Sequence, residues 1–301
     1  MVINMYDIII VGAGPAGLTS ALYAGRANKK ILVLETKVPG GQIVNAHKVT
    51  NYPGIDNISG SDYATNLYNQ VLNLGVEVKF ETVLSINDNK EVTTNNNTYK
   101  AKAIILATGA ENRRLRIENE DKLVGKGVSY CATCDGNFYK GKEVAVVGGG
   151  NSALEDALYL SDIASKVYLI HRRDSFRGEE SLSDQIKNKS NIEIIYNSNV
   201  ISINGEDKIE SITIKNNLEQ TQTINIDALF VAIGQEPKNI IFKNIVEIDS
   251  NGYIVSHDDV YTSKKGIYVA GDAREKILRQ LTTAVSDGSI AATVAIKEME
   301  D

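Results

Sequence analysis

The only two cysteines of the chain, Cys131 and Cys134, lie in the run Cys-Ala-Thr-Cys-Asp-Gly. Cysteines separated by two residues can close a small disulfide ring or share a metal ion. Structural zinc requires four nitrogen or sulfur ligands, and the chain adds only three histidines, His47, His171 and His257, none of them paired at ligand spacing. The spacing therefore favours a redox-active pair over a zinc site or two inert thiols.

Asp135 follows directly after the second cysteine. The thiolate is the attacking form in disulfide exchange, so a neighbouring carboxylate can take up and return protons as the dithiol forms and opens. The alternative is that Asp135 is a helix N-cap or a turn residue, a common role for aspartate. Both interpretations stay open at this point.

Two glycine-rich turns have the spacing of dinucleotide-binding motifs. The turn at 12–17 reads G-x-G-x-x-G and the turn at 148–153 reads G-x-G-x-x-A, and each follows a β-branched apolar run. In both, 23 positions separate the first glycine from the residue that ends the next apolar run, Glu35 or His171. Such glycines let the backbone approach a pyrophosphate, which then meets the N–H groups and positive dipole of the following helix. Two turns in this context are a much stronger signal than one.

The residues that end the apolar run after each glycine turn indicate that the two turns bind different nucleotides. Glu35 can accept hydrogen bonds from ribose hydroxyls and would repel a 2′-phosphate. Three arginines, Arg172, Arg173 and Arg177, follow His171, and guanidinium groups bind phosphate through paired hydrogen bonds. We therefore expect FAD or NAD on the first unit and NADP on the second. A solvated basic face is the alternative for the arginines.

These residues require strands and helices that bring them to one edge of a sheet. The pattern predicts strand, turn, helix and strand over 6–35 and again over 143–173. Three further strand ends are expected at 103–109, 229–234 and 267–272, and the last resembles the closing strand of the first unit. An apolar stripe predicts a terminal helix over 284–298.

The order of these elements predicts an α/β protein. We expect two Rossmann-like, three-layer nucleotide-binding domains, with the second inserted into the first. The expected boundaries are 1–112 and 241–301 for the FAD-binding domain, and 113–240 for the NADPH-binding domain, which carries the cysteine pair.

The composition excludes several classes of protein. With 43% hydrophobic and 23% charged residues, the chain is not disordered. A net charge of −6 argues against a general nucleic-acid binder. The apolar run at 8–11 is far shorter than the roughly 18 residues of a membrane span, and it lacks the basic leader and cleavage site of a secretory signal. We expect a cytoplasmic protein with no membrane or nucleic-acid partner.

Together the motifs resemble those of the low-molecular-weight thioredoxin reductases of bacteria, over about residues 6–292. The most specific are CATCDG at 131–136 and HRRDSFR at 171–177. The others, in the same order, are GGQI at 40–43, NYPG at 51–54, ATGA at 107–110, GGGNSALEDALYL at 148–160, GDA at 271–273 and RQ at 279–280. A small departure is Gly178, where relatives frequently have alanine.

The resemblance implies FAD and NADPH as cofactors, with Cys131, Cys134 and Asp135 as catalytic residues. The implied FAD-binding residues are Gly12, Gly14, Pro15, Ala16, Gly17, Glu35, Thr36, Gly40, Gly41, Gln42, Asn51, Thr108, Gly109, Gly271, Asp272, Arg279, Gln280 and Leu281. The implied NADP-binding residues are Gly148, Gly150, Asn151, Ser152, His171, Arg172, Arg173, Arg177, Ile233 and Gly234.

The resemblance also implies the route of the electrons. A hydride would pass from the nicotinamide to the flavin, which would open the disulfide with Cys134 on the flavin side and Cys131 attacking the disulfide of thioredoxin. Because the pair lies in the NADPH domain, that domain would rotate between two positions about hinges near 112–117 and 237–242. The protein would be a homodimer.

Other functions stay open. A ferredoxin-dependent reductase and the reductase of a peroxiredoxin system are related flavoproteins. The intact arginine cluster argues against the first, and the lack of a thioredoxin-like domain in the sequence weakens the second. A non-catalytic nucleotide-sensing module would leave the cysteine pair without a role.

Overall fold

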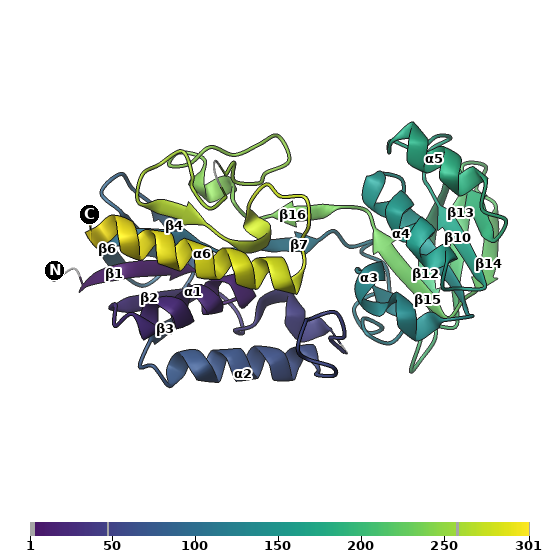
Figure 1. The fold of residues 1–301 in the computed structure, drawn as a ribbon. Coiled ribbons are helices and arrows are strands. Elements are labelled where there is room, and N and C mark those ends of the chain that lie inside the picture. Colours follow the sequence, from purple (N-terminus) through teal and green to yellow (C-terminus); the bar gives the residue numbers. More distant parts are fainter. Residues whose placement is uncertain (1–3, 47, 257–258, 301) are drawn as a thin grey trace. The chain divides into compact units, whose positions relative to one another are not determined.

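A computed structural model describes residues 4–46, 48–256 and 259–300. The chain forms two compact units (Figure 1): unit 1 consists of Met1–Glu111 and Glu236–Asp301, and unit 2 of Asn112–Gln235. The second crossing lies five residues before the expected boundary at 240/241. The reason is that Asn239 and Phe242 are fully buried in unit 1.

Unit 1 is built on a seven-stranded sheet with the order β3-β2-β1-β6-β5-β4, in which β17 also pairs with β6. The strands are β1 (Asn4–Val11), β2 (Ile31–Glu35), β3 (Glu77–Phe80), β4 (Val83–Ile86), β5 (Glu91–Thr94), β6 (Thr98–Leu106) and β17 (Ile267–Val269). Strands β1, β2, β3, β6 and β17 pair in parallel, whereas β4 and β5 form an antiparallel hairpin that continues into β6. The carboxyl ends of β1, β2, β6 and β17 therefore meet at one edge.

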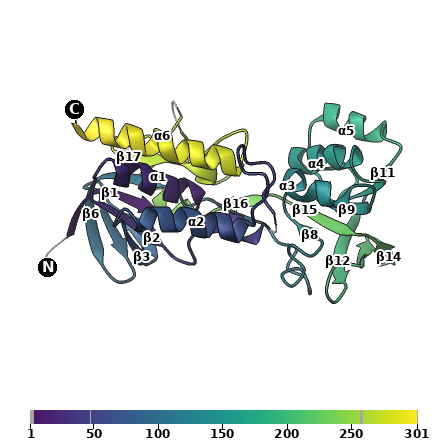
Figure 2. The same cartoon turned by 60° about the horizontal axis from the view of Figure 1, so that its bottom comes forward.

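Three helices cover one face of this sheet (Figure 2): α1 (Pro15–Arg26), α2 (Gly60–Leu72) and α6 (Leu281–Glu300). Helix α1 begins at a proline, whose missing N–H and fixed φ suit the first helical position. The expected helix over 284–298 is part of α6. Short 3-10 helices are η1 (Gly41–Asn45), η3 (Ile240–Phe242) and η4 (Gly271–Ala273). Within the described ranges, no helix is long and apolar enough to cross a membrane.

The core of unit 1 lies on both faces of β1. Ile8 and Ile10 pack against the helices, while Ile9 and Val11 pack against the β4–β5 hairpin and the segment after η3. This alternation follows from the two-residue period of a strand, and apolar residues on both faces are typical of a buried parallel strand. In the described ranges unit 1 thus has three layers, and the α-helices α1, α2 and α6 form one of them.

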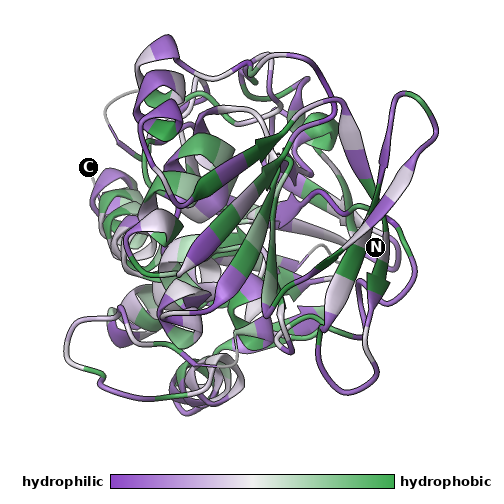
Figure 3. Cartoon of the chain, turned by 90° about the vertical axis from the view of Figure 1, so that its right-hand side faces the viewer, coloured by the Kyte–Doolittle hydropathy of each residue, from purple (hydrophilic) through white to green (hydrophobic). Residues whose placement is uncertain are grey.

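Unit 2 repeats this arrangement on a smaller scale. Its parallel sheet has the order β11-β10-β9-β15-β8, with β8 (Val128–Ser129), β9 (Glu143–Gly148), β10 (Lys166–Ile170), β11 (Ile192–Ile195) and β15 (Ala228–Ala232). One face is covered by α3 (Ala132–Asp135), η2 (Gly136–Tyr139), α4 (Asn151–Ser161) and α5 (Glu180–Lys187). The other is covered by an antiparallel sheet of β12 (Ser198–Asn204), β13 (Ser211–Asn216) and β14 (Thr221–Asn225). Figure 3 shows green, hydrophobic residues recurring along the strands and helices of the chain, with purple, hydrophilic colour in many loops.

Two short strands carry the chain across the boundary between the units. Strands β7 (Ala110–Asn112) and β16 (Gln235–Pro237) pair with each other. Gln235 Nε2 donates to Asn112 Oδ1 at 3.1 Å, and the N–H of Arg113 donates to Gly234 O at 2.9 Å. The chain thus passes between the units in two paired strands, and the expected hinges near 112–117 and 237–242 stay a prediction.

Candidate functional site

The glycine turn of unit 1 joins β1 to α1, and its three glycines have different surroundings. A Cβ on Gly12 would lie 2.3 Å from Ala107 O, and one on Gly17 would lie 1.9 Å from Gly12 O. Both positions pack backbone against backbone. A Cβ on Gly14 would meet nothing closer than 3.9 Å, and no side chain caps the helix there. The N-terminus of α1 is therefore open to an anionic group at Gly14.

Two further segments contact this turn. Glu35, at the end of β2, accepts hydrogen bonds from the N–H groups of Ala13 (2.7 Å) and Lys37 (2.8 Å), one on each carboxylate oxygen. Gly40 donates its N–H to Ala13 O at 2.7 Å, which brings η1 beside the turn. The structure thus brings together the expected residues Gly12, Gly14, Pro15, Ala16, Gly17, Glu35, Thr36, Gly40, Gly41 and Gln42.

The η4 turn after β17 lies against the same helix. A Cβ on Gly271 would lie 2.7 Å from Ala16 Cβ. Asp272 Oδ1 is buried and accepts no hydrogen bond from the described residues. Burial raises the pKa of Asp272, while the nearby Lys276 and Arg279 oppose the rise. The turn therefore presents an unused hydrogen-bond acceptor close to the N-terminus of α1.

Residues far apart in the sequence meet at the start of α6. Asn51 Nδ2 donates to Gln280 Oε1 at 3.1 Å. The guanidinium of Arg279 lies 3.9 Å from the ring centroid of Tyr253, and its buried Nε has no hydrogen-bond partner among the described residues. Leu281, the first residue of α6, is half-buried. These expected FAD-binding residues thus form one cluster in unit 1.

Thr108 and Gly109, two expected FAD-binding residues just after β6, differ in how much space surrounds them. Thr108 donates its hydroxyl to Asn239 Oδ1 at 2.7 Å, so its side chain already has a partner in unit 1. A Cβ on Gly109 would meet nothing within 4 Å. Gly109 is therefore the more open position, and a role of either residue in FAD binding stays a prediction.

The glycine turn of unit 2 reproduces the pattern of the first. A Cβ on Gly148 would lie 2.3 Å from Ala232 O and 2.5 Å from Ala153 Cβ, whereas one on Gly150 would meet nothing within 4 Å. No side chain caps the N-terminus of α4. Ser152 is exposed in its first turn. This terminus too is open to a phosphate group.

His171 lies beneath this turn. Its ring is buried, and a Cβ on Gly149 would lie 2.2 Å from it. Burial lowers the pKa of His171, with Arg177 and Arg172 acting in the same direction. The imidazole is therefore neutral near pH 7, and its expected contact with a phosphate stays a prediction.

The three arginines lie in the segment after β10, which contacts the glycine turn through the backbone of Arg177. Arg172, Arg173 and Arg177 are exposed, and the N–H of Arg177 donates to Gly149 O at 2.7 Å. Among the residues described, none of the three forms an ion pair with a carboxylate. Unpaired guanidinium groups beside a glycine turn are suited to a phosphate. The other expected residues of this site lie at the start of α4 or just after β15, namely Asn151, Ile233 and Gly234.

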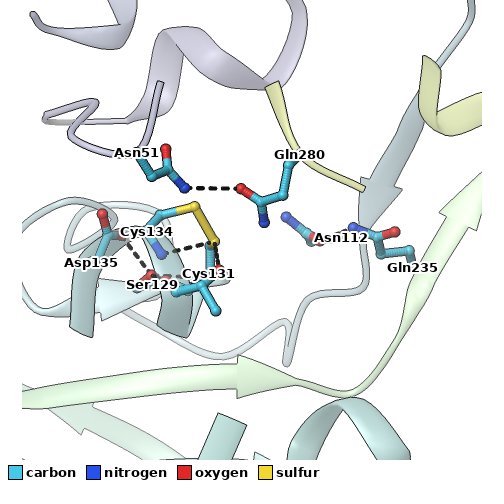
Figure 4. The surroundings of a disulfide bond; sticks show 9 residues. Asn51, Asn112, Ser129, Cys131, Cys134, Asp135, Gln235 and Gln280 are labelled. Atoms are coloured by element: carbon cyan, nitrogen blue, oxygen red, sulfur yellow. Dashed lines mark hydrogen bonds between the residues drawn. A yellow bond between two sulfur atoms is a disulfide. The ribbon is translucent and has the colours of Figure 1, made fainter. Parts of the chain in front are cut away.

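Cys131 and Cys134 form a disulfide, with their Cα atoms 5.3 Å apart (Figure 4). Cys131 is the N-cap of α3, and its Sγ accepts the N–H of Cys134 at 3.2 Å. Thr133 Oγ1 lies 3.4 Å from the same sulfur. Both cysteines are half-buried, so they can be reached from solvent.

Ser129 links the carboxylate of Asp135 to the cysteine pair (Figure 4). Its Oγ donates to Asp135 Oδ2 at 2.6 Å and accepts the N–H of Cys131 at 3.1 Å. Asp135 precedes η2 but makes no side-chain capping bond to it. The arrangement therefore favours the proton-transfer interpretation of Asp135 over the capping one.

Ser129 and Asp287 are not among the residues expected from the sequence. Ser129 stands two positions before the first cysteine, without a motif of its own. Asp287 lies on α6 between the buried Ala284 and Ala291, and a carboxylate on an apolar stripe is the signal that could have identified it. His47 and His257 lie outside the described residues, and the described residues contain no cluster of three potential metal ligands.

Comparisons with known proteins give consistent matches over the whole chain. A family model described as pyridine nucleotide-disulphide oxidoreductase matches residues 6–288. A thioredoxin reductase of Listeria innocua is 42% identical, covering 99% of this chain and 95% of that protein. A "34.2 kDa protein in rubredoxin operon" of Clostridium pasteurianum is 43% identical, covering 97% and 96%.

A solved structure agrees with these matches. The thioredoxin reductase of Streptococcus pyogenes is 40% identical, covers 98% of each chain and has a TM-score of 0.94. The expected α/β architecture of two Rossmann-like domains is therefore confirmed.

Proposed function

The chain belongs to the pyridine nucleotide-disulphide oxidoreductase family, and from this premise we propose that it is an NADPH-dependent thioredoxin reductase that carries FAD. The observation that carries the proposal is the half-buried Cys131–Cys134 disulfide, with Asp135 held beside it, in a chain that has two open dinucleotide-binding turns. Relatives that match nearly the full length of the chain are named thioredoxin reductase.

The residues of unit 1 fit FAD. The open position at Gly14 suits a pyrophosphate, and Glu35 suits a ribose hydroxyl at the end of β2. The buried Oδ1 of Asp272 accepts no hydrogen bond from the described residues, and a hydroxyl of FAD would satisfy it. We therefore propose unit 1 as the FAD-binding domain, with Arg279 and Gln280 near the isoalloxazine.

The residues of unit 2 fit NADPH rather than NADH. Gly150 is open, and Arg172, Arg173 and Arg177 are exposed without a carboxylate partner among the described residues. No carboxylate stands at the strand end, where His171 takes the place that Glu35 has in unit 1. We therefore propose that the arginines bind the 2′-phosphate.

FAD, when bound, supplies hydride acceptance from NADPH and delivery of the electron pair to the disulfide. The cysteines then reduce the partner. We assign Cys131 as the attacking thiolate, because the N–H of Cys134 and the hydroxyl of Thr133 both lie within reach of its sulfur and stabilise negative charge there. Cys131 displaces one sulfur of the partner's disulfide, and Cys134 then attacks Cys131 to release the second and re-form the disulfide.

Asp135 moves the proton in this exchange. When the disulfide opens, one thiolate and one thiol form, so one proton is needed at the sulfur that does not attack; when the disulfide re-forms, that proton leaves. Ser129 holds Asp135 Oδ2 at 2.6 Å and bonds to the backbone of Cys131, so the carboxylate is oriented before either step. This role is a proton transfer at the Cys134 sulfur.

The proposed partner is thioredoxin, and the family resemblance further implies a homodimer. A cysteine pair that must cycle between dithiol and disulfide is typical of the reducing cytoplasm, where we place the protein. Steady-state turnover of NADPH with thioredoxin disulfide tests the proposal, and light scattering of the purified protein tests the dimer. Turnover with reduced ferredoxin instead of NADPH, or with a peroxiredoxin-type partner and not thioredoxin, would favour one of the related functions.

A further inference from the structure

Asp287 is a buried carboxylate that the proposed mechanism does not use. It is 5% exposed, and both of its oxygens have partners. Oδ2 accepts the N–H of Gly271 at 3.0 Å and Lys276 Nζ at 2.8 Å, while Oδ1 accepts from Arg274 at 3.1 Å. Asp287 therefore joins helix α6 to the η4 turn and to two cations that follow the turn.

Backbone packing determines where this carboxylate lies. A Cβ on Gly288 would lie 2.2 Å from Ala16 O, and Ser20 Oγ donates to Gly288 O at 3.0 Å. Gly271 packs against Ala16 as well. The first turn of α1, the η4 turn and α6 thus meet at one point, which leaves the side chain of Asp287 little freedom to move away from Gly271.

Two carboxylates, those of Asp287 and Asp272, lie near the ammonium group of Lys276. Its side chain is 7% exposed, and its Nζ lies 2.8 Å from Asp287 but 4.0 Å from Asp272 Oδ1. The first distance is a charge-assisted hydrogen bond and the second is not. A buried ammonium that loses its partner is costly, so without Asp287 the nearest remaining carboxylate would attract Lys276. That would occupy the oxygen of Asp272 that now has no hydrogen-bond donor.

We propose that Asp287 is a positioning residue of the flavin site: it fixes the Gly271 turn and holds Lys276 away from Asp272, so that Asp272 Oδ1 remains available to a hydroxyl of the cofactor. Asp272 touches the cofactor and Asp287 acts through it. This inference rests on the proposed function, because it takes unit 1 to be the FAD-binding domain.

The affinity for FAD tests this role independently of turnover. Asp287→Asn removes the charge that holds Lys276, and we expect FAD to bind about tenfold to a hundredfold more weakly, the range for a lost charged hydrogen bond. Adding Lys276→Met to Asp287→Asn removes the competing cation and should recover most of the affinity. Asp259→Asn is the matched control, because it removes the exposed partner of Arg274 (2.9 Å) and should leave FAD binding unchanged. The readout is the fraction of FAD released from purified protein on dilution, measured by flavin fluorescence.

The outcomes separate this inference from the proposed function. Wild-type affinity in Asp287→Asn, or no recovery in the double variant, would overturn the positioning role; a purely structural role lowers the melting temperature without such recovery. If Asp287→Asn does not fold, Asp287→Glu keeps the charge but displaces it, and unchanged FAD affinity in that variant would also overturn the inference. A wild-type protein that binds no FAD would instead contradict the proposed function.

Discussion

Ser129 donates its hydroxyl to Asp135 Oδ2 at 2.6 Å while accepting the N–H of Cys131 at 3.1 Å. One short side chain thus couples the carboxylate to the backbone of the cysteine that we assign as the attacking one. The carboxylate is held in a single orientation before any proton moves, which avoids reorganisation during the reaction. Substitutions of Ser129 and Cys134 test the path of protons and electrons around this pair.

Ser129→Ala removes the group that orients Asp135. We expect the reduction of thioredoxin to slow by about tenfold, the cost of one hydrogen bond to a charged group, while NADPH still bleaches the flavin at the wild-type rate. Anaerobic rapid mixing separates the two steps. Ser161→Ala is the control, because this serine of unit 2 donates only to the Leu158 carbonyl (2.6 Å). An unchanged rate of thioredoxin reduction would show that Ser129 does not orient Asp135.

Cys134→Ser removes the sulfur that closes the cycle. We expect NADPH still to reduce the flavin, because the glycine turns and the arginines are untouched, while turnover with thioredoxin falls to background. Flavin absorbance and NADPH consumption with thioredoxin are the two measurements. Substantial turnover in this variant would remove the cysteine pair from the mechanism.

Arg172→Ala and Arg177→Ala each remove a guanidinium from the proposed phosphate site. The KM for NADPH should rise by about tenfold or more in each, since a hydrogen bond to a charged group is lost. The KM for NADH, which lacks the phosphate, should stay the same. Lys215→Ala, whose partner is Glu219 at 2.7 Å, is the matched control on unit 2. An equal rise in KM for NADPH and NADH would contradict the phosphate site and favour the alternative that the arginines form a solvated basic face.

Asp156 on α4 gives a prediction for the dependence of stability on pH. Burial raises the pKa of Asp156 to about 7 from 3.8, and the nearby Glu155 adds to the rise. Between these values the folded protein holds a proton that the unfolded chain has lost, so the free energy of unfolding falls as the pH rises through this interval.

Asp156→Asn should therefore stabilise the protein above about pH 8, where the wild-type carboxylate is charged, and have little effect below about pH 4. We expect the free energy of unfolding to increase by about 1–3 kcal/mol at high pH. Each kcal/mol raises the melting temperature by about 2–4 °C. Thermal unfolding at both pH values measures it. Asp162→Asn, at the exposed end of the same helix, is the control. If the difference in melting temperature between Asp156→Asn and the wild type is the same at both pH values, the raised pKa of Asp156 is contradicted.

Much of the fold follows from local spacing in the sequence. The β-branched runs before Gly12 and Gly148 become parallel strands, and the turns that follow open α1 and α4 as expected. This is possible because a glycine turn, a strand and a helix are each specified within about ten residues. The positions of Glu35 and His171 at the ends of the next strands follow from the same short repeat.

Other features depend on packing between distant segments. Nothing near Asp287 in the sequence indicates that Gly271 donates to it, because that bond depends on α6 packing against α1 at Gly288. The pairing of β7 with β16 joins residues more than a hundred positions apart. The burial of His171 likewise depends on the Gly149 backbone above it.

The most direct test of the account is whether electrons from NADPH reach the cysteine pair through FAD. The purified holoprotein is mixed with NADPH without oxygen, quenched with an alkylating reagent and examined by mass spectrometry. We predict that Cys131 and Cys134 are both alkylated after NADPH, and that neither is alkylated without NADPH or in protein stripped of FAD. A disulfide that persists in FAD-loaded protein after excess NADPH would contradict the account.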